Sequence, residues 1–211
     1  MNEGTGRLLV VCTANVCRSP LAARTLERAL AGSALGSIAV SSAGTRALEG
    51  EAMCPVSAED LDAGDGAYAT EHRARQQTGD LVRGADLVLT MEREQRSAAV
   101  QAAPGAQSKV FTLREAEALL GVLAQRDGEP PADLAALAKA MHSVRGLAPL
   151  VPIEPVKRRW WSRPVEPEDP MTIVDGHGRS REEHTAAAEQ VRTTADRVAA
   201  SVLALVGRTA A

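Results

Sequence analysis

Short apolar runs alternate along the chain with longer stretches in which apolar residues recur at helical spacing. The first run, Leu8 to Val11, is continuous and contains β-branched residues, which is typical of a strand buried on both faces. Comparable runs predict further strands at residues 38–41, 86–90 and 109–112. Because helical stretches separate these strands, the pattern predicts an α/β fold with a parallel sheet and helices on both of its faces.

The first helix is predicted to open at Ser19 and Pro20 and to continue to about Leu35, since serine can cap a helix and proline suits its first turn. The other helical stretches carry apolar residues three or four positions apart. They cover residues 57–63, 78–83, 92–102, 113–125, 132–144 and 179–206. Residues 146–170 are rich in proline and charge, which predicts a long irregular loop.

Composition narrows the class of protein. The chain has 211 residues, of which 45% are hydrophobic and 24% charged, values typical of one globular domain spanning residues 1–211. A net charge of -3 gives no basic field for nucleic acid, and no apolar run approaches the roughly 20 residues of a membrane span. Three cysteines are too few for a disulfide scaffold. We expect a cytoplasmic monomer or weak dimer that binds neither nucleic acid nor membrane.

The turn after the first strand carries the candidate chemistry. We call residues 12–18 the phosphate loop, because a turn of this length can point successive backbone N–H groups at one oxyanion. The N-terminus of the following helix aims at the same point, and Arg18 adds a planar fork for two anion oxygens. This positive environment favours the thiolate form of Cys12, a nucleophile suited to attack on phosphorus.

Two other uses of these residues are not expected. The three cysteines show no pair spacing with histidine of the zinc-binding kind, so the sequence predicts no metal site. A glycine-rich run ending in Gly-Lys is also missing, which argues against a nucleotide phosphate loop.

Residues 11–22, Val-Cys-Thr-Ala-Asn-Val-Cys-Arg-Ser-Pro-Leu-Ala, resemble the signature of low-molecular-weight protein tyrosine phosphatases. Further matches follow in order at residues 40–45, 72–76 and 86–91, and an acidic loop precedes the last helix. The resemblance covers roughly residues 7–115 and 168–206. Residues of about 116–167 have no counterpart and are expected to form an insertion or lid region.

The resemblance implies a four-stranded parallel sheet, no cofactor and a phosphotyrosine-containing protein as substrate. It implies that Cys12 forms a cysteinyl-phosphate while Arg18 and the loop amides hold the phosphate oxygens. Ser19 matches a serine that stabilises the thiolate. Asn15 and Ser42 match a pair that fixes the loop, and His72 matches a supporting histidine. The residues expected around the phosphate are Thr13, Ala14, Asn15, Val16, Cys17 and Ser19.

The general acid has two candidates. The family uses an Asp-Pro dipeptide before the last helix, and Asp169-Pro170 is the literal match. Asp175 matches better in its spacing to the helix, although Gly176 replaces the proline. Since the acid must lie over the phosphate loop, we favour Asp175 and keep Asp169 as the alternative.

Other positions bear on substrate and redox chemistry. Relatives that hydrolyse phosphoarginine commonly have threonine where this chain has Val16, which favours phosphotyrosine. Met171 or His177 stands where the family has aromatic residues beside the acid, and Trp160-Trp161 offers an alternative wall in a lid. Those tryptophans follow three basic residues, so contact with membrane or nucleic acid is a further alternative, although packing on the body is favoured.

The two cysteines other than Cys12 have different expectations. Cys17 matches a cysteine that forms a reversible disulfide with the nucleophile in some members, and a small buried residue is the alternative. Cys54 is expected in a surface loop without a chemical role.

Two competing functions remain open. One is an arsenate reductase on the same fold that uses a small-molecule thiol, since this needs only Cys12. The other is a non-catalytic phosphate-binding regulator, which the departure from Asp-Pro favours.

Overall fold

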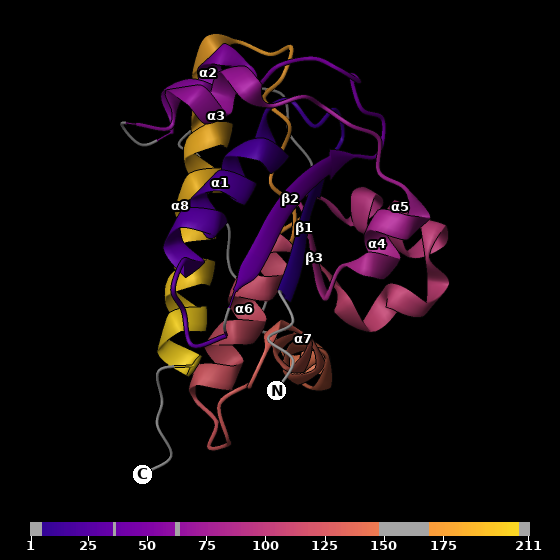
Figure 1. Cartoon of the computed structure of the whole chain (residues 1–211), viewed down its shortest axis with the longest axis vertical. Helices are drawn as coiled ribbons and strands as arrows, with labels where there is room; N and C mark the ends of the chain where they lie inside the picture. The colour runs from indigo at the N-terminus through magenta and orange to yellow at the C-terminus, as the bar shows by residue number, and fades with distance from the viewer. Residues whose placement is uncertain (1–5, 36, 62–63, 148–168, 207–211) are drawn as a thin grey trace, which may run out of the picture.

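Four parallel strands form the centre of the molecule (Figure 1), which confirms the predicted sheet. The computed structural model describes residues 6–35, 37–61, 64–147 and 169–206. Within these ranges the strands lie in the order β2-β1-β3-β4. Their bounds are Gly6–Cys12 for β1, Ile38–Gly44 for β2, Leu87–Thr90 for β3 and Val110–Thr112 for β4.

The helices follow the predicted alternation with two corrections. The helix α3 was not predicted, because its six residues carry no apolar repeat. The first helix begins at Arg18 and ends at Leu30, and its Ser19 is a helical residue whose side chain turns inward instead of capping. The bounds are α1 Arg18–Leu30, α2 Pro55–Glu59, α3 Gly66–Glu71, α4 Gly79–Gly84, α5 Arg93–Ala102, α6 Leu113–Ala124, α7 Leu134–Ser143 and α8 Arg181–Val206, with short 3-10 turns at Pro104–Lys109 and Arg145–Leu147.

The period of two along β1 divides the core between the faces of the sheet. Leu8 and Val10 belong to the larger apolar cluster, which also holds the buried faces of α1, α6, α7 and α8. Leu9 and Val11 point the other way, into a smaller cluster with α4 and α5. Figure 1 shows this division, with α1 and α8 on one side of the strands and α4 and α5 on the other. Both faces of β1 are therefore buried, as its continuous apolar run predicts.

The order of the strands determines where a ligand site forms. The chain leaves β1 toward β2 on one side and later returns to β3 on the other, so β1 ends between two neighbours. Cys12 pairs with Gly44 of β2, and Val11 pairs with Thr90 of β3. Crevices outside the carboxyl ends of parallel strands bind ligands at such reversals. Cys12 occupies that position.

The described part of the predicted insertion packs on the same core. Leu134, Leu137 and Met141 of α7 are buried in the larger cluster. Leu134 also lies next to Gly6, at the amino end of β1, about 20 Å of strand away from Cys12. Residues 148–168, with Trp160 and Trp161, lie outside the described residues, so the lid stays a prediction.

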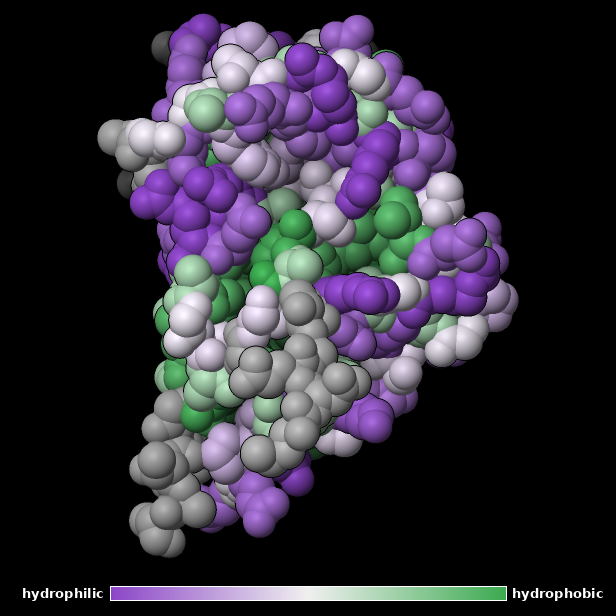
Figure 2. Space-filling model, viewed as in Figure 1, coloured by the Kyte–Doolittle hydropathy of each residue, from purple (hydrophilic) through white to green (hydrophobic). Residues whose placement is uncertain are grey.

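The surface in Figure 2 differs between regions. Apolar side chains gather in a band across the middle of this face, and hydrophilic side chains predominate around the ends of the molecule. One edge strand of the sheet is β2, and its first residues Ile38, Ala39 and Val40 are partly buried or exposed. Among the helices that are described, none combines the length and apolarity that crossing a membrane requires.

Candidate active site

Neighbouring segments hold the phosphate loop by its backbone carbonyls. Every carbonyl from Cys12 to Cys17 accepts a hydrogen bond from outside the loop. The donors are Thr45 N to Cys12 O at 2.9 Å, Arg46 N to Thr13 O at 2.9 Å, Leu48 N to Ala14 O at 3.0 Å, His72 Nε2 to Asn15 O at 2.7 Å, Cys54 N to Val16 O at 2.7 Å and Leu21 N to Cys17 O at 3.3 Å.

This pattern determines where the amides point. A trans peptide holds its C=O and N–H on opposite sides, so outward carbonyls turn the following N–H groups toward the inside of the loop. The N–H of Asn15, for example, donates to Cys12 Sγ at 3.3 Å. The arrangement is an anion-binding nest with the thiol of Cys12 at its base.

Asn15 fixes the curvature of the loop. Its backbone has a φ of 59°, in the left-handed region that asparagine tolerates better than most residues. Its side-chain amide donates to Ser19 Oγ and to Ser42 Oγ, each at 2.9 Å, and its Oδ1 accepts from the N–H of Arg75 at 2.9 Å. The side chain is fully buried, so all of these bonds form away from water.

Gly44 permits β2 to come close to the loop. A Cβ added at this position would lie 2.5 Å from Thr13 O and 3.0 Å from Asn15 N. These are backbone atoms that cannot move without deforming the loop. The glycine of the 40–45 segment is therefore required by close packing.

Ser19 lies against the thiol of Cys12, with 3.1 Å between Oγ and Sγ. The same oxygen accepts from the side chain of Asn15. The hydroxyl proton of Ser19 can be donated to Cys12 Sγ, and the more distant carbonyl of Ala43, at 3.5 Å, is its other acceptor. Both residues are buried: Ser19 has no exposed surface, and Cys12 is 2% exposed.

Arg18 is buried and held by acidic and backbone oxygens. Its guanidinium contacts Glu92 Oε1, donates to Ile173 O at 2.9 Å and to Asp175 Oδ2 at 2.5 Å. Burial lowers the pKa of Arg18, but the negative charges of Cys12, Asp175 and Glu92 outweigh this effect and raise it. Arg18 is thus a permanent cation at the edge of the loop.

Glu92 and Gln95 are site residues that the sequence analysis did not identify. Both lie at the start of α5, where they form a capping box. Gln95 Nε2 donates to Thr13 Oγ1 at 3.0 Å and to Glu92 Oε1 at 2.9 Å. Their position directly after β3, at the carboxyl edge of the sheet, is the signal that points to them.

The two candidate acids lie in different surroundings. We call residues 169–180 the acid loop. Asp175 contacts Arg18 at the phosphate loop and accepts from the N–H of His177 at 3.0 Å. Asp169 pairs with Arg93 Nε at 2.5 Å and accepts from the N–H of Met171, and these interactions hold the pKa of Asp169 below its usual value against the opposing effect of burial.

Gly176 lies directly on α8. A Cβ at this position would be 2.6 Å from Cα of His184 and 3.1 Å from Cβ of Ala187. No larger residue fits without moving the loop away from the helix. This contact is the physical reason for glycine where the family pattern has proline.

Cys17 and Cys54 lie together beside the phosphate loop. Cys54 was predicted in a surface loop, and this was wrong: it is 8% exposed, because α8 covers it through His184. Cys17 Sγ lies 3.2 Å from His177 Nδ1, and Cys54 Sγ lies 3.5 Å from His184 Nε2. The hydrogen bond from Cys17 lowers the pKa of Cys54 and raises that of Cys17 itself.

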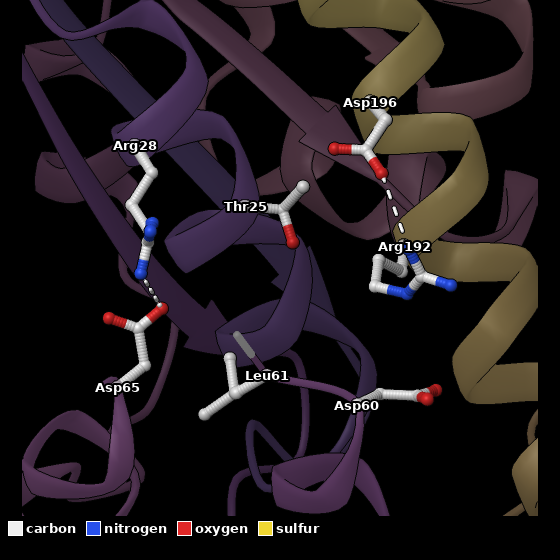
Figure 3. Close-up of a pocket in the computed structure, with 7 residues that line it drawn as sticks. All are labelled: Thr25, Arg28, Asp60, Leu61, Asp65, Arg192 and Asp196. Carbon is white, nitrogen blue, oxygen red and sulfur yellow. Dashed lines mark hydrogen bonds and ion pairs between the residues drawn. The ribbon is translucent and has the colours of Figure 1, made fainter. Parts of the chain in front are cut away.

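A separate pocket lies between α1, α8 and the segment around Asp60 (Figure 3). It has a volume of about 30 Å³, enough for about two water molecules. Figure 3 shows Arg28 pointing at Asp65 and Arg192 at Asp196, and burial raises the pKa of Asp60. The phosphate loop contributes no residue to its lining. This pocket is therefore distinct from the candidate active site.

Nests that present amides to a dianion beside a thiol belong to phosphatases with a cysteine nucleophile, and comparison with protein-family models gives the same class. Residues 7–120, more than half of the chain, match the family described as "Low molecular weight phosphotyrosine protein phosphatase". The chain belongs to this family and is a phosphoric monoester hydrolase of the protein-tyrosine-phosphatase type.

Known relatives support the assignment. "Probable low molecular weight protein-tyrosine-phosphatase EpsP" of Ralstonia nicotianae is 42% identical over 110 residues, which cover 52% of this chain and 72% of that protein. "Low molecular weight protein-tyrosine-phosphatase Wzb" of Salmonella typhi is 42% identical over 105 residues, covering 50% and 66%.

The crystal structure of the tyrosine phosphatase Wzb from Escherichia coli in complex with phosphate has a similar fold, with a TM-score of 0.58 and 22% identity. It covers 93% of this chain and 98% of that one. This likeness shows the fold alone.

Proposed function

We propose that the chain hydrolyses phosphotyrosine in proteins by two successive displacements at phosphorus, with Cys12 as nucleophile and Asp175 as general acid. The observation that carries this proposal is the contact of Asp175 with Arg18 at the edge of the nest that surrounds Cys12. The acid and the anion-binding groups thereby converge on one point.

In the first displacement, the Cys12 thiolate attacks phosphorus and the bond to the tyrosine oxygen breaks. Arg18 and the inward amides hold the phosphate oxygens as charge develops on them. Asp175 gives its proton to the leaving phenolate oxygen, since it lies on the side of Arg18 that faces the acid loop. Ser19 stabilises the sulfur through its hydroxyl.

In the second displacement, water attacks the cysteinyl-phosphate and the sulfur–phosphorus bond breaks. Asp175, now a carboxylate, takes the proton of that water. Phosphate leaves and Cys12 returns to the thiolate. No metal or redox partner enters either step.

Val16 supports phosphotyrosine over phosphoarginine. It is buried in a small cluster with Cys17, Cys54 and Ala74, and its aliphatic side chain has no hydrogen-bonding group. A phosphotyrosine-bearing protein is accordingly the proposed partner. The free state of Cys12, Cys17 and Cys54 supports action in the reducing cytoplasm.

The choice of acid is tested with aryl phosphates whose phenols differ in acidity. We expect Asp175→Ala to slow hydrolysis of phenyl phosphate by about 100-fold or more, and to slow it far less when the phenol is strongly acidic and needs no proton. Asp169→Ala is the matched control and keeps the wild-type rates. Equal losses for both substrates, or a larger loss in Asp169→Ala, would overturn the assignment of Asp175.

The nucleophile is tested by Cys12→Ser. We expect no measurable turnover, while inorganic phosphate still binds because the nest and Arg18 remain. Acid quenching of the wild type during turnover should trap phosphate on Cys12, detectable by mass spectrometry. Turnover in Cys12→Ser would remove the basis of the proposal, and so would efficient thiol-dependent arsenate reduction in the absence of aryl phosphate hydrolysis.

A further inference from the structure

Two cysteines and two histidines converge beside the phosphate loop. The thiol sulfurs of Cys17 and Cys54 and one ring nitrogen each of His177 and His184 all lie within 4.8 Å of one another. We propose that these four side chains form a mononuclear tetrahedral zinc site. The proposal revises the expectation from sequence spacing that the chain holds no metal.

The distances match those between ligands of one zinc ion. Bonds of roughly 2.3 Å to sulfur and roughly 2.0 Å to nitrogen at tetrahedral angles put a sulfur and a nitrogen ligand about 3.5 Å apart. Cys17 Sγ and His177 Nδ1 are 3.2 Å apart, and Cys54 Sγ and His184 Nε2 are 3.5 Å apart. Small rotations of the side chains bring both pairs to the ideal value.

The donor set selects the metal. Two thiolates and two imidazoles are borderline to soft ligands, which disfavour calcium and magnesium and suit zinc in tetrahedral geometry. Two thiolates also neutralise a divalent cation, so the complex has no net charge. This matters because Cys17, Cys54 and His184 are buried.

The ligands come from four segments of the chain. Cys17 lies in the phosphate loop directly before α1, Cys54 precedes α2, His177 lies in the acid loop and His184 lies in α8. The close contact of Gly176 with Cα of His184 brings the two imidazoles together, with ring centroids 5.8 Å apart and nearly perpendicular planes. Four protein ligands complete the coordination, so the site is structural and leaves no position for substrate.

Such a site would clamp the acid loop to the phosphate loop. His177 is two residues after Asp175, and Cys17 is next to Arg18, so one ion would fix the distance between the proposed acid and the anion-binding groups. This consequence rests on the proposed function, whereas the zinc site itself does not. The site would also engage Cys17 in a metal bond, in place of the disulfide with Cys12 that the family resemblance implies.

The test measures metal binding directly on the full-length chain. The chain is stripped with a chelator under reducing conditions and titrated with Zn²⁺ or with Co²⁺ as a spectroscopic probe. We expect one equivalent to bind, and the cobalt form to show thiolate charge-transfer bands with the ligand-field bands of a tetrahedral site. X-ray absorption of the zinc form should show two sulfur and two nitrogen neighbours.

Variants assign the ligands. Cys54→Ser and His177→Ala should weaken binding by about 100-fold or more, since each removes one of four ligands. His177 is exposed, so its loss leaves the core intact. Cys12→Ser and His142→Ala are the matched controls and should bind as the wild type does, because neither residue belongs to the cluster.

Three outcomes would overturn the zinc site. They are no stoichiometric binding by the wild type, unchanged binding in both ligand variants, or a Cys17–Cys54 disulfide that forms in place of metal binding. If a variant does not fold, the absorption spectrum of the wild-type zinc form decides. A phosphatase that binds no zinc would refute this site alone, and a zinc-binding chain without phosphatase activity would refute only the proposed function.

Discussion

The phosphate loop and the acid loop face each other across the candidate active site, but they are held in opposite ways. Backbone groups fix the phosphate loop, since every carbonyl from Cys12 to Cys17 is bonded outward. Side chains position the acid loop. Its contacts with the phosphate loop all involve side chains: Asp175 and the carbonyl of Ile173 contact Arg18, and His177 contacts Cys17.

The difference indicates which half of the site is rigid. Backbone hydrogen bonds from neighbouring segments leave the phosphate loop little freedom, whereas the acid loop is held mostly by side-chain contacts, so we expect its local opening to cost less free energy. The exception is Ile173, which is fully buried and donates its N–H to Met91 O at 2.8 Å. Asp175 therefore sits between one backbone anchor and the contact of Gly176 with α8.

The largest expected effect comes from a substitution that deforms the phosphate loop. Gly44→Ala introduces a methyl group 2.5 Å from Thr13 O, so the loop must shift and activity should fall by about 100-fold or more. The measurement is kcat/KM for an aryl phosphate. Gly121→Ala is the control: it lies in α6 with open space around it, and should keep activity while stabilising the fold by roughly 0.5–1 kcal/mol. An active Gly44→Ala variant would contradict the close packing.

A second change separates backbone strain from hydrogen bonding in the same loop. Asn15→Ala and Asn15→Gly both lose the bonds to Ser19, Ser42 and Arg75, but glycine adopts a positive φ freely. Both variants should lose activity. In denaturant unfolding, the glycine variant should be more stable than the alanine variant by about 1 kcal/mol. Equal stabilities would mean that the left-handed backbone does not persist in the alanine variant.

A third change acts on the acid loop alone. Gly176→Ala pushes the loop away from His184, so the position of Asp175 shifts while the phosphate loop stays intact. We expect kcat for phenyl phosphate to fall by about tenfold and the affinity for inorganic phosphate to remain that of the wild type. Weaker phosphate binding would show instead that the two loops are coupled.

The smallest expected effect concerns His72, whose Nε2 donates to the carbonyl oxygen of Asn15 in the phosphate loop. Burial, helped by the charges of Arg75 and Arg73, lowers the pKa of His72 against the opposing bond to Asn15. The unfolded chain then binds the proton more readily, so stability decreases as pH falls below about 6.5 and levels off once the folded form is also protonated. His72→Gln should flatten this slope in denaturant unfolding, whereas His142→Gln should not.

Sequence reasoning worked where a signal lies within a few neighbouring residues. The apolar runs located the four strands of the described sheet, and the segment from Cys12 to Arg18 between a strand and a helix start located the loop. Sequence reasoning failed where the burial of a residue depends on elements that pack on it from elsewhere in the chain. Cys54 precedes a proline at the start of a short helix, and nothing in the neighbouring sequence shows that α8 buries it.

Residues brought in from distant elements were missed for the same reason. Glu92 is 74 positions from the arginine that it contacts. The cluster of Cys17, Cys54, His177 and His184 spans almost the whole chain and matches no short spacing rule. Spacing to the following helix favoured Asp175, and Asp175 is the candidate that lies beside Arg18, because this distance limits where a short loop can reach; its role as the acid stays a prediction.

The outward carbonyls have a practical consequence for protein engineering. The phosphate loop takes its curvature from donors at Thr45, Arg46, Leu48, Cys54 and His72. A synthetic peptide with the loop sequence would therefore not adopt this shape in water. Transplanting the anion-binding function to another scaffold would require the 44–72 segment to be carried along with it.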